Sequence, residues 1–304
     1  MINGNHNNKP GITVVAPVYN GAATIDRCIE SILSLDYPEE RLEIIVVDND
    51  SRDNTAEIVQ KYPVKLLSEK KRGAAAARNK GWRNASHDLV AFTDADCVVD
   101  KKWLSCLVAG FTDSKTGGCG GKVMPAPPRN IIEEYIIHKD ILSQERALMD
   151  EPISPPFIVT ANAIYSKDAL EAIDGFDETM IFPAEDADLS WRMQWKGYSL
   201  EYVPEAVVVH YHRSDLVGLL KQVRLYGAGS AALFARHRER FGYNSFTVWR
   251  TYRELLYSFV KTPFSLVFGW DRLHKFIPAL DFLCAGSFLY GKIITSIKNR
   301  VRFF

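Results

Sequence analysis

The chain has 304 residues, of which 47% are hydrophobic and 24% charged, an ordinary composition for a globular protein with a sizeable core. The net charge of zero hides two parts of opposite sign, because residues 210–304 carry 15 basic and 5 acidic side chains while the preceding part carries 22 and 32. The five cysteines show no Cys-x-x-Cys spacing, which argues against a disulfide framework or a zinc site and indicates reduced thiols in a cytosolic protein.

The first ten residues are polar, are predicted to be disordered, and hold no apolar segment typical of a signal peptide. From there to residue 93, continuous apolar runs alternate with helical patterns. We expect strands at 12–17, 43–48, 64–67 and 89–93, and helices at 25–35 and 73–85 with a short one after Asn54. Continuous apolar runs are typical of strands buried on both faces, so this region predicts a parallel sheet built from βαβ units.

Beyond residue 96 the pattern is mixed. We expect helices at 101–111, 130–149, 167–173 and 186–195, a strand at 157–165 and an extended segment at 200–210. The glycine-rich run at 117–121 predicts a tight turn into a strand, and Gly197 is a stop signal for the helix before it. The predicted fold class is therefore α/β, with a mixed, mostly parallel sheet flanked by helices.

The segment from Ser214 onward is predicted to be helical, and it holds two strongly apolar stretches, 255–270 and 276–297. Charges interrupt both stretches, among them Lys261 and Lys292. Because a charge inside a spanning helix is costly, we expect these basic, aromatic-rich helices to lie at the surface of an anionic membrane. A buried helical cap is the alternative. No nucleic-acid-binding motif accompanies the basic residues, so we expect no nucleic-acid partner.

The most informative feature is the pair Asp94 and Asp96, directly after the apolar strand at 89–93. In an open α/β sheet, ligands bind beyond the carboxyl ends of the strands. Two carboxylates there make a hard-oxygen site that suits Mg²⁺ or Mn²⁺ carrying a diphosphate. The alternative is a solvated turn, which is what most Asp-x-Asp triplets form.

Side chains near the other strand ends fit around this pair. Tyr19 offers an aromatic edge for a nucleotide base, unless it is a core aromatic. Asp48 can accept a hydrogen bond from a base N–H, or it forms a turn. Gly73 begins a helix whose free N–H groups favour a phosphate, although a Gly-Ala run also serves close helix packing. Arg78, on the same helix, can reach a diphosphate or hold Asp94.

Two further polar pairs follow. His210 and His212 end the extended segment at 200–210 and would point to opposite faces of a strand, so only one of them can face a site. Two histidines at a strand end favour a metal site over a structural role. Glu185 and Asp186 begin a helix, where they either supply a general base or only complement the helix N-terminus.

Taken together, these motifs resemble the family 2 glycosyltransferases of the GT-A fold. The matching pieces stand in the family's order and are Pro17-Val18-Tyr19-Asn20, residues 47–51, residues 72–81, Asp94-Ala95-Asp96, residues 175–178, Glu185-Asp186 and His210. The resemblance implies a GT-A catalytic domain at 11–213, and the region predicted above to be helical follows it at 214–304. It also implies transfer of a sugar from a nucleotide-diphosphate donor, with inversion and with a divalent metal, Mn²⁺ or Mg²⁺.

The resemblance implies roles for the donor-binding residues. Pro17, Tyr19 and Asp48 belong to the part of the site that holds the base. Gly73 and Arg78 lie toward the diphosphate.

The same resemblance implies roles at the reacting centre. Asp94 faces the donor's ribose or sugar, and Asp96 is the firmer metal ligand. Relatives place a histidine as the third ligand, which we take to be His210, with His212 left to contact the diphosphate. Asp186 matches the catalytic base.

We expect Asn162, Glu185 and Trp191 to line the acceptor side, and Asp188 to pair with Arg192 one helical turn on. Gln222-Val223-Arg224-Leu225-Tyr226 does not match the Gln-x-x-Arg-Trp signature of processive members, so a polymerase with its own channel is not predicted.

The expected protein is thus a cytoplasmic glycosyltransferase, peripheral on the inner face of the cell membrane, that uses a glycan or lipid-linked acceptor. Two alternatives remain open at this point. One is a sugar-1-phosphate nucleotidyltransferase, which would need a basic, glycine-rich loop after the first strand. The other is a non-catalytic module that binds a nucleotide sugar or a glycan.

Overall fold

The structure is a computed structural model that describes residues 9–149, 155–241 and 245–303. Most of the N-terminal segment that we predict to be disordered lies outside these residues. Backbone contacts divide the described chain into two compact units. The first unit takes its residues from 1–124, 142–179 and 185–211, and the second from 125–141, 180–184 and 212–304. The expected boundary at 213/214 lies close to the last of these breaks, but the sequence analysis assigned both short inner segments to the first domain.

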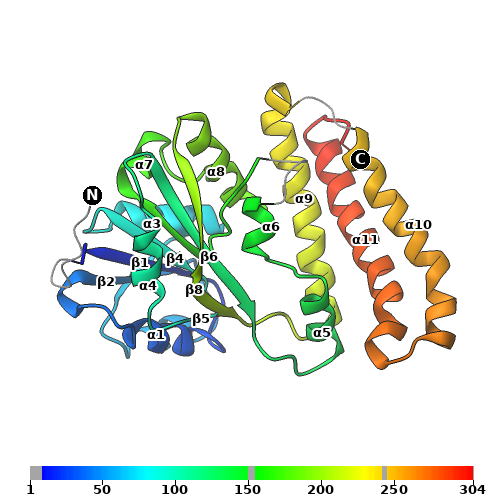
Figure 1. Ribbon diagram of the computed structural model, residues 1–304, viewed down its shortest axis with the longest axis horizontal. Coiled ribbons are helices and arrows are strands. Elements are labelled where there is room, and N and C mark those ends of the chain that lie inside the picture. Colours follow the sequence, from blue (N-terminus) through cyan, green and yellow to red (C-terminus); the bar gives the residue numbers. More distant parts are fainter. Residues whose placement is uncertain (1–8, 150–154, 242–244, 304) are drawn as a thin grey trace. The chain divides into compact units, whose positions relative to one another are not determined.

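The first unit is built on an eight-stranded sheet in the order β3-β2-β1-β4-β7-β6-β8-β5 (Figure 1). The strands are β1 (Ile12–Val18), β2 (Leu42–Asp48), β3 (Lys65–Ser68), β4 (Leu89–Thr93), β5 (Cys97–Val99), β6 (Thr116–Pro125), β7 (Asn162–Ser166) and β8 (Ser199–His210). β1 pairs in parallel with β2 and β4, and β2 with β3. β7 is antiparallel to β4 and β6, and β5 is antiparallel to β8. The sheet is therefore mixed, with its parallel part formed by the first four strands.

Helices pack on both faces of this sheet. They are α1 (Ile25–Leu33), α2 (Thr55–Val59), α3 (Ala74–Arg83), α4 (Trp103–Ala109), α6 (Gln144–Met149), α7 (Lys167–Ala172) and α8 (Glu185–Trp195), with a short 3₁₀ turn, η1, at Glu39–Arg41. Successive residues of a strand point to opposite faces. Val14 accordingly packs in a cluster with Ile29 of α1 and Trp103 of α4, whereas Val15 packs with Ala77 of α3 on the other face. The continuous apolar run of β1 is explained by this double burial.

Three predicted elements differ from the structure. Residues 117–121 form no turn but lie within β6. The glycines there serve packing, because Tyr165 and Gln144 occupy the space that side chains at Gly118 and Gly120 would fill. The helix predicted at 130–149 is two helices, α5 (Ile131–His138) and α6, separated by residues with left-handed backbone angles, Asp140 (φ 50°) and Leu142 (φ 75°).

The strand predicted at 157–165 begins only at Asn162, as β7. The sequence analysis missed β5, which has only three residues. Such a short strand leaves no periodic signal, and it exists because β8 supplies its partner.

The second unit consists of α5 and three long helices, α9 (Leu216–Phe241), α10 (Ser245–Phe268) and α11 (Arg272–Lys298). α11 lies against α5, α9 and α10 (Figure 1). Glycine allows the close approach of α9 and α11, since a Cβ atom at Gly227 would lie 2.0 Å from the Phe288 carbonyl oxygen and one at Gly291 would lie 2.0 Å from that of Arg224. Among the described residues, α11 alone is long and apolar enough to cross a membrane by the measures of length and composition.

We predict that Gly291→Ala lowers the free energy of unfolding by roughly 1–3 kcal/mol, the usual cost of overpacking a close contact. Gly286→Ala is the matched control on the same helix, because a Cβ atom there would meet its nearest neighbour, Leu255 Cδ1, at 3.9 Å. Helix propensity alone makes that substitution stabilising by up to about 1 kcal/mol. Denaturant unfolding of both variants measures the difference, and equal stabilities would contradict the packing argument.

Candidate active site

The carboxyl ends of β1 and β2 bring the expected base-binding residues to one edge of the sheet. Tyr19 follows β1 and is 48% exposed, so it is not the core aromatic of the alternative interpretation. Asp48 ends β2 and accepts a hydrogen bond from the Ser51 N–H at 3.3 Å. The guanidinium of Arg72 lies 5.2 Å from the centre of the Tyr19 ring. This edge therefore offers an exposed ring, a carboxylate and a cation for a planar ligand. Pro17 lies within β1, paired with Val47.

Asn49, which the sequence analysis did not single out, holds the segment between β3 and α3. Its side-chain amide donates to the carbonyl oxygens of Glu69 and Lys71 at 2.9 and 2.8 Å, and its Oδ1 accepts the Gly73 N–H at 2.9 Å. Gly73 has a φ of 127°, which only glycine adopts without strain, and a Cβ atom there would meet nothing within 4 Å. The Gly73 N–H is thus already used, and a phosphate at this helix start would depend on the next N–H groups.

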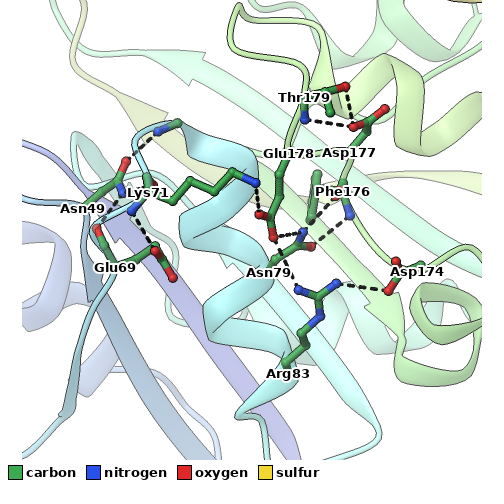
Figure 2. Close-up of polar contacts among 11 residues, drawn as sticks. Asn49, Glu69, Lys71, Asn79, Arg83, Asp174, Phe176, Asp177, Glu178 and Thr179 are labelled. Carbon is green, nitrogen blue, oxygen red and sulfur yellow. Dashed lines mark hydrogen bonds and ion pairs between the residues drawn. The ribbon is translucent and has the colours of Figure 1, made fainter.

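Glu178 joins this segment to the rest of the first unit. Figure 2 shows Lys71, Asn79 and Arg83 converging on its carboxylate, at 2.6, 2.8 and 3.3 Å. The ammonium of Lys71 and the amide of Asn79 hold the pKa of Glu178 below its ordinary value. Asn79 also donates to the Phe176 carbonyl oxygen at 2.8 Å. The motif at 175–178 therefore anchors α3 and the β3–α3 segment through side-chain hydrogen bonds.

Arg78 is the buried cation of the site. Its guanidinium contacts Asp94 Oδ1 at 2.9 Å and Glu185 Oε1 at 2.6 Å, so it joins α3, the end of β4 and the start of α8. Burial alone would lower the pKa of Arg78, but the two carboxylates raise it above its ordinary value. Of the two alternatives open from the sequence, reaching a diphosphate or holding Asp94, the structure exhibits the second.

The expected metal ligands Asp96 and His210 come together. A turn closed by the Cys97 N–H and the Asp94 carbonyl oxygen places both acids after β4, and the Tyr211 N–H binds the Asp96 carbonyl oxygen. Asp96 Oδ1 lies 3.4 Å from His210 Nε2, and the Asp96 side chain keeps 26% of its surface exposed. A carboxylate and an imidazole that converge at an accessible point fit a divalent cation such as Mn²⁺ or Mg²⁺.

Asp94, the other expected metal ligand, and His212, expected at the diphosphate, are placed differently. Asp94 shares its charge with Arg78, which makes Asp96 the stronger candidate ligand. His212 belongs to the second unit, where its imidazole, when protonated, helps the Arg129 guanidinium to lower the pKa of Glu133. Asp96 and His210 therefore form the candidate metal site.

Asp186 lies at the start of α8, next to Glu185 and near Arg78. Burial, and after it the charge of Glu185, raises the pKa of Asp186 to about 7, against the opposing effect of Arg78. Its carboxylate accepts the Ala187 N–H at 2.8 Å. A carboxyl group with this pKa can accept a proton near neutral pH, which is the property required of a general base.

The three expected acceptor residues are packed within the protein. Asn162 is fully buried, donates to the carbonyl oxygens of Lys122 and Ala206, and accepts the Trp103 indole N–H at 2.7 Å. It has no exposed surface for an acceptor, so we assign it a structural role instead.

Trp191 is 6% exposed and donates its indole N–H to the Pro155 carbonyl oxygen at 2.8 Å. The carboxylate of Glu185 binds Arg78, as described above. The expected pair of Asp188 and Arg192 is confirmed, with Arg192 Nε donating to a fully buried Asp188 carboxylate at 2.7 Å.

With this geometry established, the chain can be compared with known proteins. The mannosyltransferase PcManGT from Pyrobaculum calidifontis, solved in complex with GDP-Man and Mn²⁺, matches with a TM-score of 0.66 at 20% identity. The match covers 94% of this chain and 89% of that one. This likeness, together with the mixed sheet and its helices, defines the chain as an α/β protein of the GT-A fold.

Sequence comparison identifies the family. The profile of glycosyl transferase family 2 matches residues 13–174, and the chain belongs to this family. Its relatives include the pre-mycofactocin glycosyltransferase of Mycobacterium tuberculosis, 30% identical over 236 residues, which are 75% of this chain but 48% of the relative. Glycosyltransferase AglE of Haloferax volcanii is 30% identical over 227 residues, 71% of this chain and 72% of AglE. The chain spans about half the length of the first of these relatives.

We predict that Asn162→Ala lowers the free energy of unfolding by about 2–4 kcal/mol, because buried donors and acceptors left unpaired cost about 1–3 kcal/mol each. Thermal or denaturant unfolding measures the loss. In the folded fraction, the KM for the acceptor should stay at the wild-type value. A raised acceptor KM with unchanged stability would restore Asn162 to the acceptor side.

Proposed function

We propose that the chain is a metal-dependent, inverting glycosyltransferase that moves a sugar from a nucleotide-diphosphate donor to a hydroxyl group of a glycan or lipid-linked acceptor. The observation that carries the proposal is the arrangement around Arg78. This side chain joins Asp94, beside the pair of Asp96 and His210, to Glu185, beside Asp186. A cation-binding point and a group able to accept a proton near pH 7 thus flank one buried guanidinium.

The donor would lie along the carboxyl edge of the sheet. Tyr19 and Asp48 would hold the base, and the start of α3 would face the diphosphate. Asp96 and His210 would hold a divalent cation, which neutralises charge on the departing nucleoside diphosphate. The presence of GDP-Man and Mn²⁺ in the PcManGT complex supports this assignment.

Asp186 would serve as the base. Its carboxylate takes the proton of the acceptor hydroxyl as that oxygen bonds to the anomeric carbon and the bond to the diphosphate oxygen breaks. Attack from the face opposite the leaving group inverts the anomeric configuration. Because the pKa of Asp186 is raised to about 7, only a fraction of the chains holds a deprotonated base below that pH.

Docking of the second unit on a membrane would favour a lipid-linked acceptor. Large apolar side chains are exposed along α10 and the turn after it, and those more than 60% exposed are Trp249, Leu256, Phe259, Phe264, Val267, Phe268 and Trp270. Lys261, Arg272 and Lys275 add positive charge to the same region. Apolar and aromatic side chains rimmed by cations suit the interface of an anionic membrane.

The internal contacts of α11 indicate that this helix packs against the protein and does not cross the membrane. Asp281 in its middle binds Tyr135 Oη at 2.7 Å and Lys139 Nζ at 2.6 Å, both from the α5 region. These contacts hold a charged group of α11 against protein. We therefore propose an enzyme peripheral on the inner face of the cell membrane, with α10 and the α10–α11 turn toward the lipid.

The two alternatives receive less support. A nucleotidyltransferase needs basic residues in the loop after the first strand, whereas the backbone N–H groups of Asn20, Gly21 and Ala22 bind Ser51, Thr55 and Asp53 in this structure. A non-catalytic binding module has no use for a carboxyl group whose pKa is raised to about 7. Transfer by the purified chain would exclude such a module.

We predict that Asp186→Asn lowers turnover by about 10²–10⁴-fold, the usual contribution of a general base, while Mn²⁺-dependent donor binding stays near the wild-type value. Turnover of the unmodified chain should rise with pH through about 7 and then level off, because protonation of the base at low pH removes its function. Transfer assays across pH and calorimetric titration of the donor measure the two quantities.

Asp96→Ala is the contrasting variant, since it should remove metal-dependent donor binding as well as turnover. Product analysis adds an independent check. Retention at the anomeric carbon, full turnover of Asp186→Asn, or full activity in excess chelator would each contradict the proposed mechanism.

We predict that the full chain co-sediments with vesicles containing anionic phospholipid and that added salt weakens the binding. The double variant Val267→Glu, Trp270→Glu should lose most of this binding, since both side chains are at least 70% exposed and would enter the interface. Val217→Glu, at a position of 76% exposure on α9, is the matched control and should bind like the wild type. A wild-type chain that stays in the supernatant at low salt would refute docking.

A further inference from the structure

A thiol lies beside the proposed metal ligands. Cys97 directly follows Asp96 and begins β5, which runs antiparallel to the end of β8. Cys97 and His210 stand opposite each other in this pairing, and opposite residues of an antiparallel ladder project their side chains on the same face. The buried thiol therefore faces the imidazole from the neighbouring strand.

The distances bring these three groups within reach of one ion. The ligand atoms of Asp96, Cys97 and His210 all lie within 4.8 Å of one another, and Asp96 Oδ1 is 3.4 Å from His210 Nε2. Two ligands at about 2.0–2.1 Å from a tetrahedral Zn²⁺ are roughly 3.4 Å apart, and a thiolate at about 2.3 Å lies roughly 3.5 Å from them. The separation between the Cys97 sulfur and each of the other two ligand atoms thus needs to shrink by at most about 1.3 Å to complete the set.

We propose that Cys97 is a third protein ligand recruited by thiophilic dications, so that Zn²⁺ or Cd²⁺ binds through Asp96, Cys97 and His210. The inference rests on the proposed metal site and extends it. Mg²⁺ and Mn²⁺ prefer oxygen ligands and leave the thiol unused, whereas Zn²⁺ and Cd²⁺ prefer sulfur and nitrogen. On binding, the S–H bond breaks, the metal–sulfur bond forms, and the proton passes to solvent.

The expected consequence is inhibition. A tetrahedral ion with three protein ligands keeps a single position for a phosphate oxygen. A six-coordinate ion held by Asp96 and His210 keeps several positions and can chelate a diphosphate through two oxygens. Zn²⁺ therefore competes with Mn²⁺ for the position and supports donor binding poorly, which makes the centre sensitive to zinc.

The experiment uses the full chain and Co²⁺ alone as a spectroscopic substitute for Zn²⁺. A thiolate ligand gives Co²⁺ a sulfur-to-metal charge-transfer band in the near ultraviolet, which carboxylate and imidazole ligands do not give. We expect the band in the wild type, its loss in Cys97→Ala, and its displacement by added Zn²⁺. Competition with a chromophoric chelator should show that Zn²⁺ binds at least about tenfold more weakly to that variant. Loss of a residue that only hydrogen-bonds to a metal ligand already lowers metal affinity by about that factor, and loss of a ligand itself should cost no less.

Cys119→Ala is the matched control, because Cys119 is an equally buried thiol in β6 of the same sheet and lies outside the three-residue group. It should keep both the band and the Zn²⁺ affinity. Cys97→Ser is the second variant if Cys97→Ala does not fold, and it too should lose the band, since a hydroxyl group gives no charge transfer of this kind.

The outcomes separate this inference from the proposed function. A wild-type chain without the band, or a band that survives in Cys97→Ala and Cys97→Ser, overturns the role of Cys97. If Mn²⁺ nevertheless supports donor binding in the wild type, the proposed metal site stands and only the recruitment of the thiol fails. If neither Mn²⁺ nor Co²⁺ binds, both proposals fail together.

Discussion

The buried guanidinium of Arg78 is the constraint on which the arrangement of the site depends. A charge removed from water is tolerated only where opposite charges and hydrogen bonds replace the lost solvent. Asp94 and Glu185 meet this requirement, and they come from segments about ninety residues apart in the sequence. The contact turns Asp94 toward the protein, which leaves Asp96 for a cation. It also places a second carboxylate and a cation around Asp186, whose pKa reflects the balance of burial, Glu185 and Arg78.

The edge of the sheet around this centre is held by amide and carboxylate side chains that would themselves bind no substrate. Asn49 fixes the backbone before α3 by three hydrogen bonds, and Glu178 joins that segment to α3 (Figure 2). If this site binds a flexible diphosphate, as we propose, an already ordered backbone favours binding, because less conformational entropy is then lost. The motif at 175–178, known at first only through its resemblance to a family, acquires a physical role in this way.

The second unit combines close helix packing with an exposed apolar surface. Its helices pack closely through Gly227 and Gly291, and Asp281 of α11 is paired with Tyr135 and Lys139. The aromatic side chains of α10 and of the turn after it are left exposed. A soluble protein seldom leaves so many large apolar groups together in water, which is why we propose an anionic membrane as the partner of this surface.

The sequence by itself determined the parallel βαβ half of the sheet, the helical end of the chain, and the membership in a glycosyltransferase family. Continuous apolar runs and short motifs are local signals, and they survive in a single sequence. The tertiary structure alone decided that β5 exists, that Asn162 is a buried hydrogen-bonding residue, and that Arg78 holds Asp94, the second of the two roles that the sequence left open. It also placed Cys97 beside His210, although the spacing of the cysteines argued against a zinc site. These facts depend on contacts between residues far apart in the chain, and no local pattern encodes which distant partner a polar side chain will meet.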